Sequence, residues 1–147
     1  MNEVCNIAEY VLYYCYKHNI KNCTNKKLQK LLYYIQAWSL ALNGKAIFSD
    51  DFEAWLHGPV IPSIYQKYKQ YSFNPLPEVK KFDIKKLEKK DIEFIDAVLD
   101  KYAGFDAEFL EYRTHIEDPW KIARSKSTIS SIITKKSMRD YYRSVKK

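Results

Sequence analysis

The stretch TNKKLQKLLYYIQAWSLALNGKAIFSDDFEAWLHGPVIPSIY, residues 24–65, holds the clearest structural signals in the sequence. Within it, apolar residues recur at steps of three and four, which is the spacing of one side of an α-helix. These residues are Leu28, Leu31, Leu32, Ile35, Trp38 and Leu42. Thr24 or Asn25 can cap the first turn, and Asn43-Gly44 tolerates the left-handed conformation that commonly follows a helix. The pattern predicts a central helix over residues 25–43 with one apolar side facing a core.

The residues after this helix alternate between apolar and polar types, as expected for short β-strands. Residues 47–48 and residues 52–56, joined by a polar turn, predict a small β-hairpin. After the hairpin, Pro59 keeps Gly58 out of the α-helical region, and Pro62 suits the first turn of a helix. The chain is therefore predicted to make a fixed corner and then to begin a new helix.

Further helices are predicted on both sides of this stretch, because apolar spacing and capping residues recur there. The predicted elements are residues 3–18 with Asn2 as a possible cap, residues 91–102, a short segment capped by Asp106, a short segment opened by Asp118-Pro119, a short extended or turn segment at residues 127–134, and a last helix opened by Ser137 in capping-box style. Residues 72–82 hold two prolines and are expected to form a loop. We therefore expect a single domain over residues 1–147, mainly α and compact, with one small β-hairpin.

Composition limits the functional classes. The 147 residues, 46% of them hydrophobic, suffice for one buried core. The formal net charge of +7 is compatible with nucleic-acid binding. The lysines are scattered or alternate with acids, and no nucleic-acid-binding motif accompanies them, so a solvated basic surface is favoured. An odd number of cysteines without CxxC spacing, no secretion signal and no membrane-spanning apolar run predict a reduced, cytoplasmic protein without membrane contact.

Two histidines and a nearby glutamate are the best candidates for chemistry. His115 and Glu117 imitate the first half of a zinc-deaminase motif, but the Pro-Cys-x-x-Cys that would complete it does not follow. His57, His115 and Glu117 could also meet as a metal site, although no spacing motif supports one. The sequence has neither a nucleophile elbow nor a phosphate-binding glycine loop. We therefore expect no catalytic residue, metal or cofactor, and a structural His115 that is hydrogen-bonded in the core.

Several sequence blocks, in a fixed order, resemble one known family. The blocks are KLQKLLYYIQAW (27–38), NGKAIF (43–48), EAW (53–55), GPV (58–60) and THIEDPWK (114–121). Together they are similar to the Panacea domain, the family that includes SocA-like and GepA-like phage-associated proteins. The resemblance extends over about residues 5 to 142, nearly the whole chain. The matching positions are Lys27, Leu28, Gln29, Lys30, Leu31, Leu32, Tyr33, Gln36, Trp38, Glu53, Ala54, Trp55, Gly58, Pro59, Val60, Pro62, Tyr65, Thr114, His115, Glu117, Pro119 and Trp120.

The resemblance implies a function that the residues alone do not. Panacea domains are known as antitoxins that bind a co-encoded protein toxin directly and suppress it. One branch is known as an adaptor that brings its toxin to an AAA+ protease. We therefore expect a non-enzymatic antitoxin whose partner is a cognate protein toxin. Delivery of the toxin to an AAA+ protease and a basic nucleic-acid-binding regulator are the alternatives.

The polar residues of the matching blocks admit two interpretations, since they either bind the toxin or hold the fold together. The toxin-binding hypothesis places a contact face at Lys30, Tyr33, Tyr34, Trp55 and His57. The other motif residues are expected to be structural, namely Gln36, Trp38, Glu53, Gly58, Pro59, His115, Glu117, Pro119 and Trp120. Within that set, Gln36, Glu53 and His115 are expected to form one internal polar network.

Overall fold

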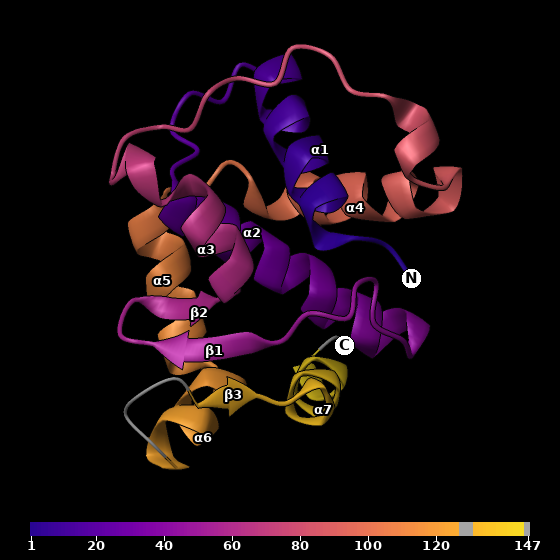
Figure 1. The fold of residues 1–147 in the computed structure, drawn as a ribbon. Coiled ribbons are helices and arrows are strands. Elements are labelled where there is room, and N and C mark those ends of the chain that lie inside the picture. Colours follow the sequence, from indigo (N-terminus) through magenta and orange to yellow (C-terminus); the bar gives the residue numbers. More distant parts are fainter. Residues whose placement is uncertain (127–130, 146–147) are drawn as a thin grey trace.

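Helix α2 (Asn25–Trp38) runs through the middle of the protein, and the other elements pack around it (Figure 1). The structure is a computed structural model that describes residues 1–126 and 131–145. Over these residues the other α-helices are α1 (Val4–Lys17), α3 (Pro62–Tyr68), α4 (Lys89–Tyr102), α5 (Ala107–Ile116), α6 (Asp118–Lys126) and α7 (Lys135–Val145). The strands are β1 (Phe52–Trp55), β2 (Gly58–Val60) and β3 (Ile132–Ile133). The expected mainly α fold is therefore confirmed.

The central helix is buried on nearly all sides rather than along one stripe. Of its residues, only Lys26 and Trp38 keep partial exposure. Its neighbours are α1, α3, α4, α5, α7 and β2, so the polar residues between its apolar positions also face protein. A π-helical turn, Ser39–Asn43, extends α2, and Leu42 in this turn is exposed although the sequence predicts it to face the core. Because buried polar groups need hydrogen-bond partners, the polar residues of α2 must bind neighbouring elements.

Side-chain caps and a glycine fix several helix ends as the sequence predicts. Thr24 accepts a hydrogen bond of 3.2 Å from the backbone N–H of Lys27 at the start of α2. Asp106 accepts one of 2.8 Å from the N–H of Phe109 at the start of α5. Gly44 follows the π-helical turn with a φ of +73°, a left-handed conformation that glycine adopts at little cost.

Two predicted helix starts are wrong. Asn2 does not cap α1, because its side-chain amide donates instead to the Ile47 carbonyl at 2.9 Å and to the Asp91 carboxylate at 3.1 Å. This ties the N-terminus to the loop after α2 and to α4. Helix α7 begins before Ser137, because Thr134 accepts the Ser137 N–H at 3.1 Å and so acts as the cap.

The β-hairpin is shifted along the chain relative to the prediction. β1 pairs with β2 across a two-residue turn, Leu56-His57. The predicted first strand, residues 47–48, does not join this pair. The side-chain amide of Gln36 binds it instead, donating to the Phe48 carbonyl at 2.7 Å and accepting the Ile47 N–H at 2.9 Å. These two bonds satisfy backbone groups that a strand partner would otherwise have to satisfy.

A third strand joins the hairpin from the C-terminal part of the chain, a pairing that the sequence does not predict. β3 pairs antiparallel with β1 through Phe52 and Ile133, which gives the sheet order β2-β1-β3. β3 falls within the predicted extended segment, residues 127–134, of which residues 127–130 lie outside the described part. α2 and α5 contact β2, while α6 contacts β1 and β3, so the hairpin is held between these helices (Figure 1).

Candidate functional site

A cleft of about 610 Å³ opens between the first half of α2, the hairpin turn, α3 and the start of α5. Its lining residues are Asn22, Thr24, Asn25, Lys26, Gln29, Lys30, Trp55, Leu56, His57, Val60, Tyr65, Lys69, Ser72, Phe73, Asp106, Ala107 and Glu108. Lys30 and Gln29 are almost completely buried and form its floor, whereas Leu56 and Phe73 are 64% and 84% exposed and stand at its mouth. The cleft therefore combines a polar floor with an apolar rim.

Two side-chain amides on α2 hold one wall of the cleft in place. Gln29 accepts the backbone N–H of Ile61 at 2.8 Å and donates to the side chain of Asn25 at 3.1 Å. Asn25 in turn donates to the Tyr65 carbonyl at 3.3 Å. These bonds fix the end of the hairpin and the first turn of α3 against α2. Polar residues of the central helix therefore position the chain that follows the hairpin.

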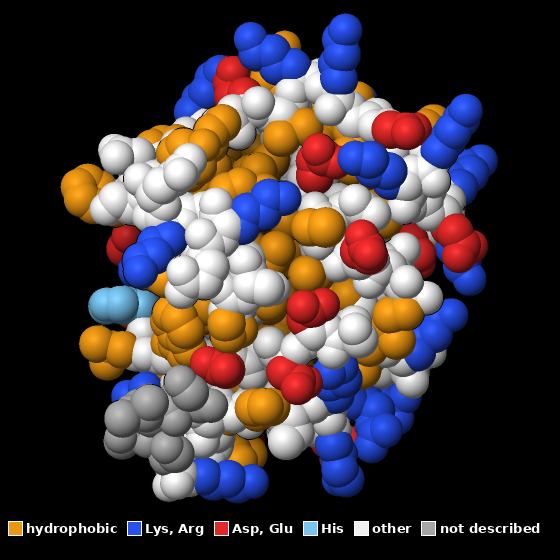
Figure 2. Space-filling view, in the orientation of Figure 1, with side chains coloured by type: hydrophobic (Ala, Val, Ile, Leu, Met, Phe, Trp, Pro, Cys, Tyr) orange, Lys and Arg blue, Asp and Glu red, His pale blue; other side chains and the backbone are white. Residues whose placement is uncertain are grey.

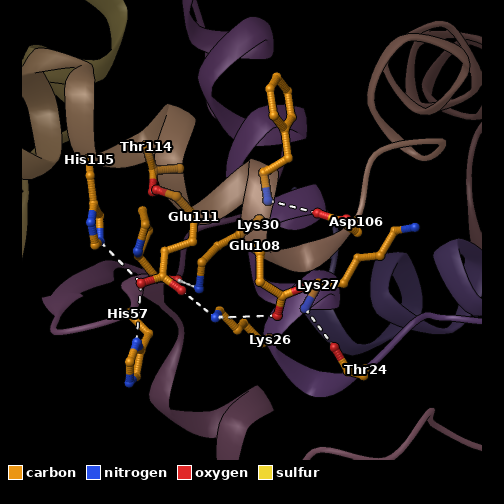
Figure 3. A network of polar contacts seen from close by, with 12 residues as sticks. Thr24, Lys26, Lys27, Lys30, His57, Asp106, Glu108, Glu111, Thr114 and His115 are labelled. Atoms are coloured by element: carbon orange, nitrogen blue, oxygen red, sulfur yellow. Dashed lines mark hydrogen bonds and ion pairs between the residues drawn. The ribbon is translucent and has the colours of Figure 1, made fainter.

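Glu111 on α5 is the centre of a charged cluster beside the cleft (Figure 3). Its carboxylate pairs with Lys26 and lies 3.1 Å from Nδ1 of His57 and 3.9 Å from Nε2 of His115. Partial burial acts against the charged form of Glu111, but hydrogen bonds from Lys26 and His57 bring its pKa below the usual value. Charges from α2, the hairpin turn and α5 therefore meet at one carboxylate.

Lys30 lies in the floor of the cleft beside this cluster, and it is only 1% exposed. Its ammonium group has three N–H donors, and the one hydrogen bond recorded for it within the described residues is long, 3.4 Å to the Pro59 carbonyl. Burial, followed by the nearby charge of Lys26, lowers the pKa of Lys30 to about 7, while Glu111 acts in the opposite direction. Lys30 is therefore a buried amine with incompletely used hydrogen-bonding capacity.

Gly58 allows the hairpin to approach Lys30 closely. Its φ is +109°, and a Cβ at this position would lie 2.6 Å from Cε of Lys30 and 3.1 Å from Oγ1 of Thr114. A side chain here would collide with the end of the Lys30 side chain, so either that side chain or the hairpin would have to move. Both the backbone conformation and the available space therefore require glycine.

The indole ring of Trp120 on α6 supports the cluster from the other side. It stacks on His115 with ring centroids 3.9 Å apart, and its Nε1 donates to the Trp55 carbonyl at 2.9 Å. Nε2 of His115 is buried and has no hydrogen-bond partner among the described residues. Burial lowers the pKa of His115. The expectation of a core histidine with satisfied hydrogen bonds is therefore wrong for this nitrogen.

A second polar cluster, centred on Glu117, lies in the interior. The Glu117 carboxylate accepts hydrogen bonds of 2.7 Å from the hydroxyls of Tyr34 and Tyr142, and it pairs with Arg113 at 3.2 Å. The hydroxyls of Tyr33 and Tyr142 are 3.1 Å apart. Burial, with Glu117 as the next cause, raises the pKa of Tyr34 far above its usual value. This cluster joins α2, the end of α5 and α7.

The predicted contact face is divided between the cleft and the interior. Lys30, Trp55 and His57 line the cleft. Tyr33 and Tyr34 are fully buried, so their predicted position on a surface is wrong. The physical reason is that α7 covers this side of α2, and the two hydroxyls reach Tyr142 and Glu117 in the interior. A toxin contact at the other three residues stays a prediction.

The single polar network expected for Gln36, Glu53 and His115 does not exist. Gln36 binds the backbone of residues 47–48, Glu53 accepts the Trp55 indole N–H at 2.8 Å, and His115 lies beside Glu111. The three side chains therefore act at three separate places, because α2, β1 and α5 present them to different neighbours.

Sequence reasoning missed four side chains that complete the two clusters, namely Lys26, Glu111, Arg113 and Tyr142. A signal for most of them exists in the sequence. Lys26 and Lys30, Glu111 and His115, and Arg113 and Glu117 are each four residues apart, so each pair shares one side of a helix. Only Tyr142, from the far end of the chain, has no local signal of this kind.

The two histidines considered as metal ligands flank Glu111, and Glu117 belongs to the other cluster. Within residues 1–126 and 131–145, no group of three or more His, Cys, Asp or Glu side chains is arranged to hold a metal ion. In the same part of the chain, no helix has the length and apolar character needed to cross a membrane.

Comparison with known proteins gives one match, and it is to a family. No curated protein and no solved structure matches this chain. The family described as "Antitoxin SocA-like, Panacea domain" matches residues 28–121, from the first turns of α2 to the start of α6. The matched region is more than half of the chain and includes most of α2, the hairpin, Glu111 and Glu117, whereas Lys26 and Tyr142 lie outside it. The chain belongs to the SocA-like antitoxin family of Panacea domains.

Proposed function

We propose that this protein is a cytoplasmic, non-enzymatic antitoxin that neutralises a co-encoded protein toxin by binding it directly. The contact surface in this proposal is the cleft with its rim, Leu56 and Phe73, together with the outer side of α5. The observation that carries the proposal is the exposure of large apolar side chains at this surface. Membership in the antitoxin family supports a toxin as the partner.

A second set of exposed apolar side chains lies on the outer side of α5. Phe109, Tyr112 and Ile116 are all exposed and follow one another at helical spacing, so they share one side of the helix. Figure 2 shows hydrophobic side chains near the left edge of the molecule, beside and below a histidine. Large exposed apolar side chains that gather in a patch are typical of protein-binding surfaces.

The positive charges on the face shown in Figure 2 do not form a continuous patch of the kind that binds nucleic acid. Lysine and arginine side chains lie around the periphery of that face, and aspartate and glutamate side chains lie between them. A duplex-binding surface usually gathers its positive charge in one patch or stripe. Protein binding is therefore the better-supported function for this surface.

The test is co-expression with the product of the neighbouring gene, with growth and co-purification as readouts. Leu56→Asp places a charge at the mouth of the cleft, and we expect co-purification to fall by about tenfold or more. Ile84→Asp is the matched control, because Ile84 is 66% exposed and Leu56 64%. Ile84 lies in the short turn Ile84–Lys86 before α4 and does not line the cleft, so its variant should bind normally.

The outcomes separate the alternative functions. Growth rescue with a stable complex supports direct neutralisation. Rescue that disappears when a cellular AAA+ protease is deleted, with loss of the toxin, would assign the adaptor function instead. DNA binding with a steep salt dependence would favour a nucleic-acid-binding regulator, because released counterions dominate such binding. Absence of both rescue and complex would reject the proposal for that toxin.

A further inference from the structure

The charges around the cleft are unevenly matched. Glu111 pairs with Lys26 and contacts His57, and Glu108 also lies 3.8 Å from Lys26. No carboxylate of the described residues lies within ion-pair distance of the Lys30 ammonium group, although Lys30 is more deeply buried than any of these residues. A buried cation without a partner is costly, so the floor of the cleft favours the arrival of a negative charge.

His115 adds a second unused polar group on the same side. Its Nε2 is buried without a hydrogen-bond partner in the described part of the chain, and it lies 3.9 Å from the carboxylate of Glu111. The positive charge of Lys30 also acts on the His115 ring. Lys30 and His115 therefore each have hydrogen-bonding capacity that the described residues do not use.

The shape of the cleft fits a segment of another protein. Its volume of about 610 Å³ exceeds what one side chain needs. The exposed side chains of Leu56 and Phe73 at its mouth would lose water when a partner covers them. A residue that fills such a pocket and loses its contact with water is the kind that contributes most of the binding free energy in a protein interface.

We infer that the cleft takes an acidic side chain of the toxin, whose carboxylate pairs with the ammonium group of Lys30. The apolar neighbours of that acidic residue pack on Leu56 and Phe73. Charge complementarity selects this occupant, because the floor offers an amine without an ion-pair partner that a carboxylate would hold in its charged form, whereas Asp106 caps α5 and Glu108 and Glu111 contact Lys26. This inference rests on the proposed function, since it specifies which toxin group the same surface recognises.

Proton uptake is a consequence that needs no variant to test. With a pKa of about 7, Lys30 is mostly neutral at pH 8 in the free protein. A carboxylate beside it would raise this pKa, so complex formation at pH 8 should take up a proton. Calorimetry of the wild-type complex in two buffers of different ionisation enthalpy measures this uptake. An observed binding enthalpy that is the same in both buffers would contradict the inference, because proton uptake makes the observed enthalpy depend on the buffer.

The decisive variant is Lys30→Met, which keeps the apolar stem and removes the charge. We expect toxin binding to weaken by about 30-fold or more and the proton uptake to disappear. Lys27→Met is the matched control. Lys27 is also fully buried on α2, but its ammonium group donates to Asn22 at 2.8 Å and it does not line the cleft. The control should bind with wild-type affinity, and circular dichroism establishes that each variant is folded.

The outcomes distinguish this inference from the proposed function. If Lys30→Met binds like the wild type while Leu56→Asp does not, the surface is correct and the carboxylate pairing is wrong. If the wild type itself does not bind the toxin, the proposed function fails first. Each Asp and Glu of the toxin is replaced in turn by its amide. One of these replacements should weaken binding by an amount that is not additive with the effect of Lys30→Met. Stabilisation of the protein by free glutamate, without a toxin complex, would overturn the inference in favour of a small metabolite.

Discussion

Two glutamates six positions apart, Glu111 and Glu117, organise two polar clusters of different character. Glu117 is 5% exposed, and its carboxylate is bound by two tyrosine hydroxyls and an arginine. Glu111 lies at the edge of the cleft, where its partners Lys26 and His57 keep contact with solvent. The first cluster satisfies its charge completely, while the second leaves Lys30 and His115 with unused hydrogen-bonding capacity.

Under the proposed function, the interior cluster serves stability and the cluster beside the cleft serves binding. A buried network with every group paired is specific and expensive to break. A hydrogen-bond network with unpaired groups at the floor of a cleft lowers the stability of the free protein. A ligand that pairs with those groups gains the corresponding free energy on binding. The predictions below test this division, beginning with the largest expected effect.

The first prediction compares the two glutamates directly. Glu117→Ala should lower the free energy of unfolding by about 3–5 kcal/mol, because it leaves Arg113 and two tyrosine hydroxyls without their partner. Glu111→Ala should cost about 1 kcal/mol or less, because its ion pairs are partly exposed. Urea unfolding of both variants measures the difference. Equal losses would mean that the two clusters contribute equally to stability and would remove the basis of the comparison.

The second prediction isolates one bond of the interior cluster. Tyr142→Phe removes the hydroxyl that donates to Glu117 and keeps the ring, so the free energy of unfolding should fall by about 1.5–3 kcal/mol. Tyr112→Phe is the control, because Tyr112 is exposed on the outer side of α5 and its loss of a hydroxyl should change stability by about 0.5 kcal/mol or less. A similar small effect for both would show that Glu117 does not depend on Tyr142.

The third prediction concerns the pH dependence that Lys30 gives to the free protein. Lys30 has a pKa of about 7 when folded and an ordinary, higher one when unfolded, so the unfolded state binds more protons between these values. Stability from this group therefore rises with pH from about 7 to 10. Lys30→Met should be more stable than the wild type by about 1–3 kcal/mol at pH 7, and this advantage should shrink as pH rises.

Urea unfolding at several pH values gives the free energy of unfolding of the wild type and of Lys30→Met. The buried tyrosines are the same in both proteins, so their contribution cancels in the difference. The charges that act on Lys30 are those of Lys26 and Glu111, and both stay in place in the variant. A constant difference from pH 7 to 9.5 would show that Lys30 is not desolvated. If Lys30→Met is more stable than the wild type but binds the toxin less tightly, then Lys30 serves toxin recognition and not the stability of the fold.

Local signals explain what the sequence predicts correctly. Thr24 and Asp106 cap helices through bonds to residues three positions away, and Gly44 acts within one turn. Such contacts depend on neighbours in the sequence, so residue type and spacing are enough to predict them. Lys30, Trp55 and His57 are distant in sequence; the hypothesis of a shared contact face groups them, and the structure places all three around one cleft.

The errors come from contacts between distant parts of the chain. Residues 47–48 have the alternation of a strand, but the Gln36 side chain satisfies their backbone, so β1 pairs with the next segment instead. Tyrosine and lysine are usually at least partly exposed. No residue near Tyr34 in the sequence indicates that α7 and Glu117 bury it. Burial of polar residues on all sides of a central helix is a tertiary property.

The last and smallest prediction concerns the unpaired nitrogen of His115. His115→Phe keeps a ring on Trp120 and removes the nitrogen, so stability at pH 7 should change by about 0.5 kcal/mol or less. A hydrogen-bonded core histidine would instead cost about 1–3 kcal/mol when replaced. A loss in that range would restore the satisfied histidine that the sequence suggests and would weaken the contrast between the two clusters.

The pH dependence of the same variant gives a second, independent readout. Burial lowers the pKa of His115 in the folded state, so the unfolded state takes up a proton first as pH falls below about 6.5. Glu111 opposes this shift, whereas Lys30, His57 and Arg124 add to it. The wild type should therefore lose stability between pH 7 and 5 relative to His115→Phe. Parallel pH profiles would show that Glu111 offsets the burial of the ring, and that the cluster beside the cleft is electrostatically complete without a partner.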